Sequence, residues 1–305
     1  MKNLNPFTIN LFYIFAIGLN IVLLRYFSIH LDALNNNGVR FTVGGIALLI
    51  FVLFKYRQQF KQILTTPKLL TLALSVGIMM TANMYFYLKG VATTNAITAA
   101  IFGVISMPFG ILFAGVVFQD EREKLKSKQF WIGCILTLAG SLSFIWSGNT
   151  IAIGDSFFLG AFFLLLSITI RNIQNLIVKF SNNKLNTFVL SCFTSLTAGI
   201  MSLIFSQQSG NIGQLTTIPT WLLFSLILVG LYGIGTGMVL TFSVIQKQGI
   251  VTYQVLELIL PISTAVIAYF LLGETISLTQ VISAIVVIVG ASIALQLFPY
   301  FSRNR

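Results

Sequence analysis

Long apolar runs alternate with short polar segments along the whole chain. A helix needs about 20 apolar residues to cross the hydrocarbon core of a bilayer, and an open strand would leave its backbone groups without partners in lipid. We therefore expect an all-α integral membrane protein with ten transmembrane helices. The expected spans cover residues 7–27, 38–54, 69–88, 93–117, 130–147, 156–178, 187–206, 220–243, 249–271 and 277–298.

Composition supports this architecture and excludes several functions. Of the 305 residues, 56% are hydrophobic and 8% are charged, whereas a soluble domain has about 25% charged residues. His30 is the only histidine, and Cys134 and Cys192 lie inside apolar runs. This inventory offers no metal-ligand spacing and no His-dependent triad. We expect no enzymatic activity, no catalytic residues, no metal and no cofactor.

The distribution of basic residues predicts the orientation of the chain. The net charge of +11 would be compatible with nucleic-acid binding in a soluble protein, but here Lys and Arg lie in the loops between apolar runs, so we expect no nucleic-acid partner. With the N-terminus inside, 14 of the 18 Lys and Arg residues fall in inside segments. The positive-inside rule then predicts that both termini are cytoplasmic. We expect Arg40 and Lys89, near the outer surface, to anchor the protein to lipid headgroups or the interface.

The two halves of the chain repeat one pattern. Pro108 and Pro261 are 153 residues apart, and so are Glu121 and Glu274. We expect a first five-helix repeat over residues 1–150 and a second over 151–305. Because five spans are an odd number, the second repeat must be inverted in the membrane. Inverted repeats are common in secondary transporters, with the substrate site near the midplane between the halves; a duplicated scaffold without a transport role is the alternative.

Two ionisable residues lie inside predicted spans, where charges are costly and mark functional sites. At a rise of 1.5 Å per residue, Arg171 and Glu257 both fall about 4–6 Å to the cytoplasmic side of the bilayer centre. We hypothesise that Arg171 binds a substrate carboxylate or phosphate. Glu257 would bind a substrate cation or exchange a proton. The alternative is a static ion pair that joins the two halves.

Further polar residues share helix faces with these charges. Asn175 follows Arg171 by one turn, and Gln254 precedes Glu257 by three residues, so each pair lies on one face. Weaker candidates for substrate contact are hydrogen-bonding groups on other spans, which could equally join helices. These are Asn83 and Tyr87 in the third span, Tyr232 in the eighth and Asn20 in the first.

Proline and glycine suggest where helices bend or pack. Pro108 and Pro261 each remove a backbone hydrogen bond, so we expect paired hinges or kinks in the fourth and ninth spans. Four glycines crowd the eighth span and predict close helix packing or a flexible hinge: Gly230, Gly233, Gly235 and Gly237. The charged loop 118–128 is expected to be a solvated cytoplasmic connector.

These motifs resemble the drug/metabolite transporter superfamily in its ten-helix, EamA-type branch. The resemblance covers essentially the whole chain. It rests on Pro108, Glu121, Gly133 and Gly140, on their counterparts Pro261, Gly273-Glu274 and Gly290, and on Gly154-Asp155 and Arg40-Phe41. It implies a transporter of the bacterial inner membrane with a central cavity. Substrates in the family include amino acids, other metabolites, drugs and nucleotide-linked compounds.

We therefore expect a secondary active transporter that moves a small polar organic solute, such as an amino acid, by alternating access. The resemblance slightly favours export. The chain has no ATP-binding motif, so a proton or an exchanged counter-substrate would be the coupling partner. Alternatives are a multidrug exporter, a metabolite uptake or exchange carrier, a lipid-modifying membrane enzyme and a structural membrane protein. The partners are the solute and membrane lipid, and the protein would be a monomer or a homodimer.

Overall fold

The computed structural model describes residues 6–93, 96–148, 157–182, 184–272 and 277–295, and the described residues form helices and turns without strands. The first half contains α1 (Pro6–His30), α2 (Ala33–Lys55), α3 (Arg57–Thr65), α4 (Pro67–Thr93), α5 (Ala96–Val117), α6 (Gln119–Leu125) and α7 (Lys128–Gly148). The second half contains α8 (Phe157–Phe180), α9 (Thr187–Gln208), η1 (Asn211–Gly213), α10 (Gln214–Thr217), α11 (Thr220–Gly233), η2 (Ile234–Leu240), α12 (Thr241–Gln248), α13 (Ile250–Leu272) and α14 (Leu278–Ala294).

Each predicted span coincides with a long helix, and the expectation of an all-α membrane protein is confirmed. The transmembrane helices of the first repeat are α1, α2, α4, α5 and α7. Those of the inverted second repeat are α8, α9, the continuous segment α11–η2–α12, α13 and α14, which makes ten in all. Seven of them contain stretches long and apolar enough to cross a membrane, and the apolar parts described for α5 and α14 are shorter.

The start of the second span was predicted wrongly. α2 begins at Ala33 rather than at residue 38, because Asp32 caps it by accepting hydrogen bonds from the backbone N–H groups of Leu34 and Asn35. Three consecutive asparagines therefore lie inside the helix, and all of them are buried. Asn35 is satisfied by other helices, since it accepts from Ser206 and donates to the carbonyl of Asn211. The low hydropathy of the three asparagines excluded them from the predicted second span.

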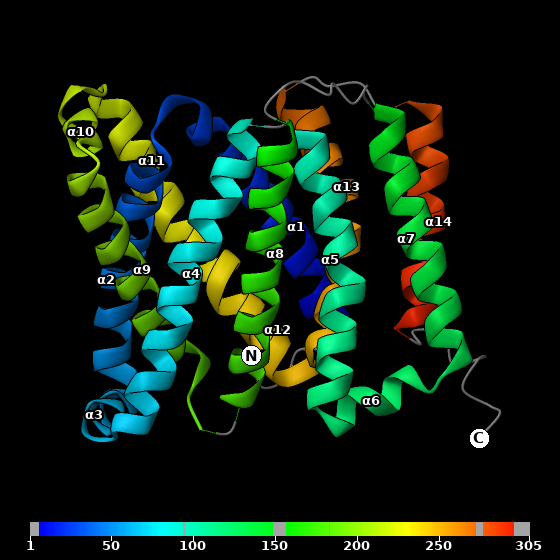
Figure 1. The fold of residues 1–305 in the computed structure, drawn as a ribbon, viewed down its shortest axis with the longest axis horizontal. Coiled ribbons are helices and arrows are strands. Elements are labelled where there is room, and N and C mark those ends of the chain that lie inside the picture. The colour runs from blue at the N-terminus through cyan, green and yellow to red at the C-terminus, as the bar shows by residue number, and fades with distance from the viewer. Residues whose placement is uncertain (1–5, 94–95, 149–156, 183, 273–276, 296–305) are drawn as a thin grey trace.

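The helices run between two ends of the bundle (Figure 1). We call the end where α3 and α6 lie the α6 end, and the opposite end the α10 end. The most extensive helix packing joins helices of different repeats: α2 packs on α9, α7 on α14, α4 on α8 and α1 on α13. The two repeats are therefore interlocked along their length rather than separate lobes.

Glycines permit the closest of these contacts. A Cβ atom added to Gly133 on α7 would lie 2.4 Å from the backbone nitrogen of Ala294 on α14. One added to Gly290 on α14 would lie 2.6 Å from the backbone nitrogen of Thr137 on α7. Real Cβ atoms cannot approach backbone so closely, so the two helices touch through their glycines.

The eighth span changes its helical form midway. α11 is α-helical to Gly233, η2 is a π-helix, and α12 resumes the α-helix at Thr241. A Cβ on Gly230 would lie 2.9 Å from the carbonyl oxygen of Arg40 on α2, whereas one on Gly235 would meet nothing within 4 Å. Close packing therefore explains Gly230 but not Gly235.

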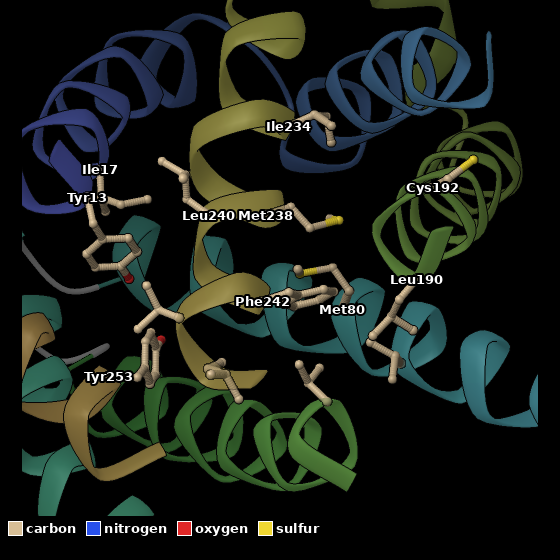
Figure 2. Packing of buried hydrophobic residues seen from close by; sticks show 14 of the residues in the cluster. Tyr13, Ile17, Met80, Leu190, Cys192, Ile234, Met238, Leu240, Phe242 and Tyr253 are labelled. Atoms are coloured by element: carbon tan, nitrogen blue, oxygen red, sulfur yellow. The ribbon is translucent and has the colours of Figure 1, made fainter. Parts of the chain in front are cut away.

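The segment η2–α12 forms the centre of the largest buried apolar cluster (Figure 2). Its residues Met238, Leu240 and Phe242 are 2–3% exposed. Helices of both repeats surround it, contributing Tyr13 and Ile17 from α1, Met80 from α4, Leu190 and Cys192 from α9, and Tyr253 from α13. One side of the irregular helix is thus covered by helices of both repeats, whereas Gly235 on its other side is exposed.

Candidate functional site

Arg171 and Glu257 meet inside the bundle. Arg171 lies on α8 and Glu257 on α13, and Nη1 of the arginine is 3.4 Å from Oε2 of the glutamate. The side chains are 25% and 15% exposed. The similar depth predicted for the two charges thus corresponds to an ion pair in the structure. Because both side chains keep some exposed surface, the ion pair remains partly accessible, unlike a fully buried pair.

Tyr13 ties this pair to the first repeat. Its hydroxyl donates a hydrogen bond of 2.8 Å to Oε1 of Glu257, and the side chain is fully buried on α1. Tyr253, one turn before Glu257 on α13, lies close to Glu257, Arg171 and Asn175. Sequence reasoning missed both tyrosines, although it singled out Tyr87 and Tyr232 on other spans, because the sequence does not show which tyrosines face the charged pair.

Amides extend the polar site across three helices. Nε2 of Gln254 on α13 donates to Oδ1 of Asn172 on α8 over 2.8 Å. Nδ2 of Asn172 in turn donates to Oγ of Ser106 on α5 over 3.2 Å. A Cβ atom on Gly110 would lie 1.9 Å from Nε2 of Gln254, so only glycine leaves room for this amide.

Several polar atoms around the charged pair lack partners. Nε of Arg171, Nδ2 of Asn175 and Oε1 of Gln254 are buried and form no hydrogen bond within the described part of the chain. Most buried polar groups in proteins are hydrogen-bonded. Three of the predicted site residues therefore present free donors or an acceptor in one region, where a polar ligand or water can satisfy them.

The weaker candidates divide between the site and helix packing. Tyr87 on α4 lies near both charges of the pair. Oδ1 of Asn83 accepts a 2.7 Å hydrogen bond from Ser167 on α8, and the hydroxyl of Tyr232 donates to the carbonyl of Ala16 over 2.9 Å. Asn83 and Tyr232 therefore join helices. Asn20 lies elsewhere, near Gly233 and Gly237 of the eighth span.

The two predicted hinge prolines lie within continuous helices. Pro108 is inside α5 and Pro261 is inside α13. A proline has no N–H to bond the carbonyl four residues earlier. For Pro261 that carbonyl belongs to Glu257, so the proline weakens the helix next to the charged pair. Whether the helices bend there during function stays a prediction.

A second charged cluster closes the α6 end. Glu121 on α6 is completely buried and accepts hydrogen bonds from Lys179 on α8 and from the backbone N–H of Ile250, the first residue of α13. Lys124 also bonds Glu121 over 3.1 Å and the carbonyl of Gln248 over 2.9 Å. A carboxylate at a helix N-terminus is favourable, and this one links α6 of the first repeat to two helices of the second.

The expectation that loop 118–128 is only a solvated connector is therefore wrong for Glu121. Its neighbour Asp120 stays 66% exposed and bonds Lys179 from the other side. Partial burial raises the pKa of Asp120, but the hydrogen bond and positive charge of Lys179 outweigh it and hold the pKa below its usual value. Glu274, the counterpart of Glu121 in the repeat, lies outside the described residues.

The expectation for Arg40 is also wrong. Its side chain is 5% exposed on α2, so it is no interfacial anchor. The assignment failed because depth along a helix does not reveal which face the residue occupies. Lys89, by contrast, is exposed on α4, with its Nζ 5.8 Å from the ring centre of Tyr85.

A groove of about 630 Å³ lies apart from the charged pair. Its lining includes Ile78, Phe86, Met201 and Phe205, so it is bounded mainly by α4 and α9 and is largely apolar. Among the described residues, no group of three His, Cys, Asp or Glu side chains is placed to hold a metal ion. The candidate site is therefore identified by the polar groups gathered around Arg171 and Glu257, and not by the volume of the groove.

Ten interlocked helices in inverted repeats enclose a charged pair of the second repeat, which Tyr13 bonds to the first repeat, and this arrangement is typical of a membrane transporter. The EamA-like transporter family profile matches residues 7–146 and 158–296. The chain therefore belongs to the EamA-like transporter family, within the drug/metabolite transporter superfamily. This family is one of transporters and not of enzymes.

Known proteins agree with this assignment. A protein of Haemophilus influenzae, named an uncharacterized transporter, is 39% identical over 296 residues, which cover 96% of this chain and 97% of that protein. An uncharacterized transporter of Methanothermobacter thermautotrophicus is 25% identical over 208 residues, covering 68% of this chain and 59% of that protein. A crystal structure at 13% identity matches with a TM-score of 0.74 over 95% of this chain and 97% of its own, which shows the shared fold.

The buried position of Glu121 predicts a large loss of stability when its charge is removed. Glu121→Gln leaves the buried Lys179 ammonium with less compensation, and removing one partner of a buried pair costs about 3–5 kcal/mol. We expect thermal unfolding of the purified protein to shift to clearly lower temperature. Glu123→Gln, the same change at an exposed site two residues along, should alter stability by less than about 0.5 kcal/mol. Equal melting of the two variants would refute the role of Glu121.

Proposed function

We propose that this protein is a secondary active transporter of a small polar organic solute, and that Arg171 and Glu257 form the centre of its solute site. The observation that carries the proposal is the ion pair between α8 and α13, bonded to α1 by Tyr13. Helices of both repeats thereby contribute to one site, as alternating access between inverted repeats requires.

The geometry of the pair favours a zwitterionic solute, such as an amino acid. Its N–O distance of 3.4 Å exceeds the roughly 2.7–2.9 Å of a strong charge-assisted hydrogen bond. The free Nε of Arg171 gives the guanidinium a second donor for a carboxylate. A bound solute would place its carboxylate on Arg171 and its ammonium on Glu257, so both charges stay compensated when the pair separates.

A multidrug exporter is the second candidate function. The apolar groove between α4 and α9 suits hydrophobic compounds better than the charged pair does. A cationic drug bound to Glu257 would leave the Arg171 guanidinium close to a like charge, which is unfavourable in a low-dielectric site. We therefore place the apolar candidate behind the zwitterion. Uptake or exchange of a metabolite would use the same site as export. The family resemblance slightly favours export.

Transport should fail when either charge of the pair is neutralised. In proteoliposomes offered a panel of labelled amino acids, nucleotides and cationic dyes, we expect Arg171→Gln and Glu257→Gln to reduce flux at least about tenfold, because hydrogen bonds to charged groups contribute roughly 1.5–3 kcal/mol each. Arg57→Gln and Glu123→Gln, at exposed positions, are the matched controls. Full flux in both pair variants at normal expression would leave the pair a static link between helices and would overturn the site.

The proposal also places the protein in the bacterial inner membrane, with both termini and the α6 end in the cytoplasm. The basic residues on and beside α3 and α6 support this orientation by the positive-inside rule.

Single cysteines can test the orientation. Gln59 on α3 and Thr216 on α10 are both exposed, at opposite ends of the bundle. In a background without Cys134 and Cys192, a membrane-impermeant maleimide should label Thr216→Cys on intact cells and Gln59→Cys only after the cells are opened. The reverse pattern would invert the proposed topology.

A further inference from the structure

Arg40 is a buried charge without a carboxylate partner in the described part of the chain. It lies two turns into α2 from the α10 end and is 5% exposed. Nη1 makes one long contact of 3.5 Å with Oδ1 of Asn36, and Nε has no partner. An ionised side chain inside a membrane protein normally pairs with another group or faces a functional cavity. This long amide contact and a cation–π contact with Phe41, whose ring centre lies 5.8 Å from Cζ, do not balance the charge as a carboxylate would.

Three asparagines near Arg40 carry unpaired amide groups. Nδ2 of Asn36, Oδ1 of Asn37 and Oδ1 of Asn20 on α1 are buried without hydrogen-bond partners among the described residues. A Cβ atom placed on Gly233 of α11 would lie 3.1 Å from Oδ1 of Asn20 and 3.6 Å from Nη2 of Arg40. Groups from α1 and α2 thus converge opposite a position of α11 that bears no side chain.

The backbone around this point is both fixed and irregular. Gly230 of α11 packs against the backbone of Arg40, where a Cβ would lie 2.9 Å from the carbonyl oxygen. This contact holds the arginine in register with Gly233. The π-helix η2 begins at the next residue, Ile234, and π-helical turns occur frequently at functional sites.

We infer that Arg40, Asn20 and Asn36 form a second binding site, distinct from Arg171 and Glu257, for the carboxylate or phosphate group of a small soluble anion. The guanidinium fork can bind two oxygens of either group, and Nδ2 of Asn36 adds an unpaired N–H donor. The inference rests on the proposed function in so far as the anion belongs to the transported solute. Binding itself requires only the buried charge and the amides.

The position of the site favours a soluble anion over a lipid headgroup. Two helical turns correspond to about 10 Å, so the backbone of Arg40 lies well inside the bundle, and its side chain is only 5% exposed. Simple anions should also prefer Arg40 to Arg171, because at Arg171 they would meet the carboxylate of Glu257, which is 3.4 Å from the guanidinium.

Anion binding to the purified full-length protein tests this site. Sodium phosphate and sodium acetate are titrated at constant ionic strength against sodium chloride, in nanodiscs of phosphatidylcholine, and the melting temperature is recorded. A ligand that binds the folded state raises this temperature saturably. We expect Arg40→Gln to raise the half-saturating concentration at least about tenfold, whereas Arg57→Gln on α3 follows the wild type.

A second variant keeps the test decisive if Arg40→Gln does not fold. Gly233→Ala retains Arg40 but places a methyl group between it and Asn20, so it should raise the half-saturating concentration several-fold. Gly235→Ala is the matched control, since its Cβ meets nothing within 4 Å.

The inference is overturned if free anions give no shift, if Arg40→Gln and Gly233→Ala respond as the wild type does, or if the shift requires phosphatidylglycerol in the nanodisc, which would identify a lipid headgroup. An anion response in a protein that shows no flux would preserve this site and overturn the transport proposal. Flux that depends on Arg171 and Glu257, without an anion response, would support the transport proposal and overturn the anion site at Arg40.

Discussion

A charge inside an apolar helical bundle needs a partner, and this requirement organises the centre of the protein. Arg171 and Glu257 satisfy it for each other across α8 and α13, and Tyr13 brings in α1. Desolvating an ion pair costs nearly as much as its attraction returns, so the pair adds little to stability. A group that costs much and stabilises little is well suited to exchange its partner for a charged solute.

The scaffold is duplicated but its chemistry is not. At the repeat offset of 153 residues, the counterparts of Arg171 and Glu257 are Gly18 and Val104. A Cβ atom on Gly18 would lie 2.4 Å from Oγ of Ser263, so the packing of α1 against α13 excludes an arginine there. The second repeat therefore supplies both charges, and the first supplies Tyr13 and the buried Glu121 that joins the repeats at the α6 end.

Hydropathy predicted the ten spans, because spans depend on averages over about 20 residues. The inverted duplication followed instead from the 153-residue offset of the proline and glutamate pairs and from the odd number of spans in each half. The similar depth of Arg171 and Glu257 could also be predicted, since helix rise is fixed. Side-chain direction could not. Arg40 was assigned to the interface because its face of α2 is invisible in the sequence, and Glu121 was assigned to solvent because its burial depends on where α13 begins, 129 residues later.

Removing both charges of the pair at once tests the central claim most directly. In the double variant Arg171→Gln/Glu257→Gln no uncompensated charge remains, and the two similarly sized amides can hydrogen-bond to each other in place of the ion pair. The account predicts a melting temperature close to that of the wild type, together with loss of solute flux in proteoliposomes. A stable double variant that transports at the wild-type rate would contradict it.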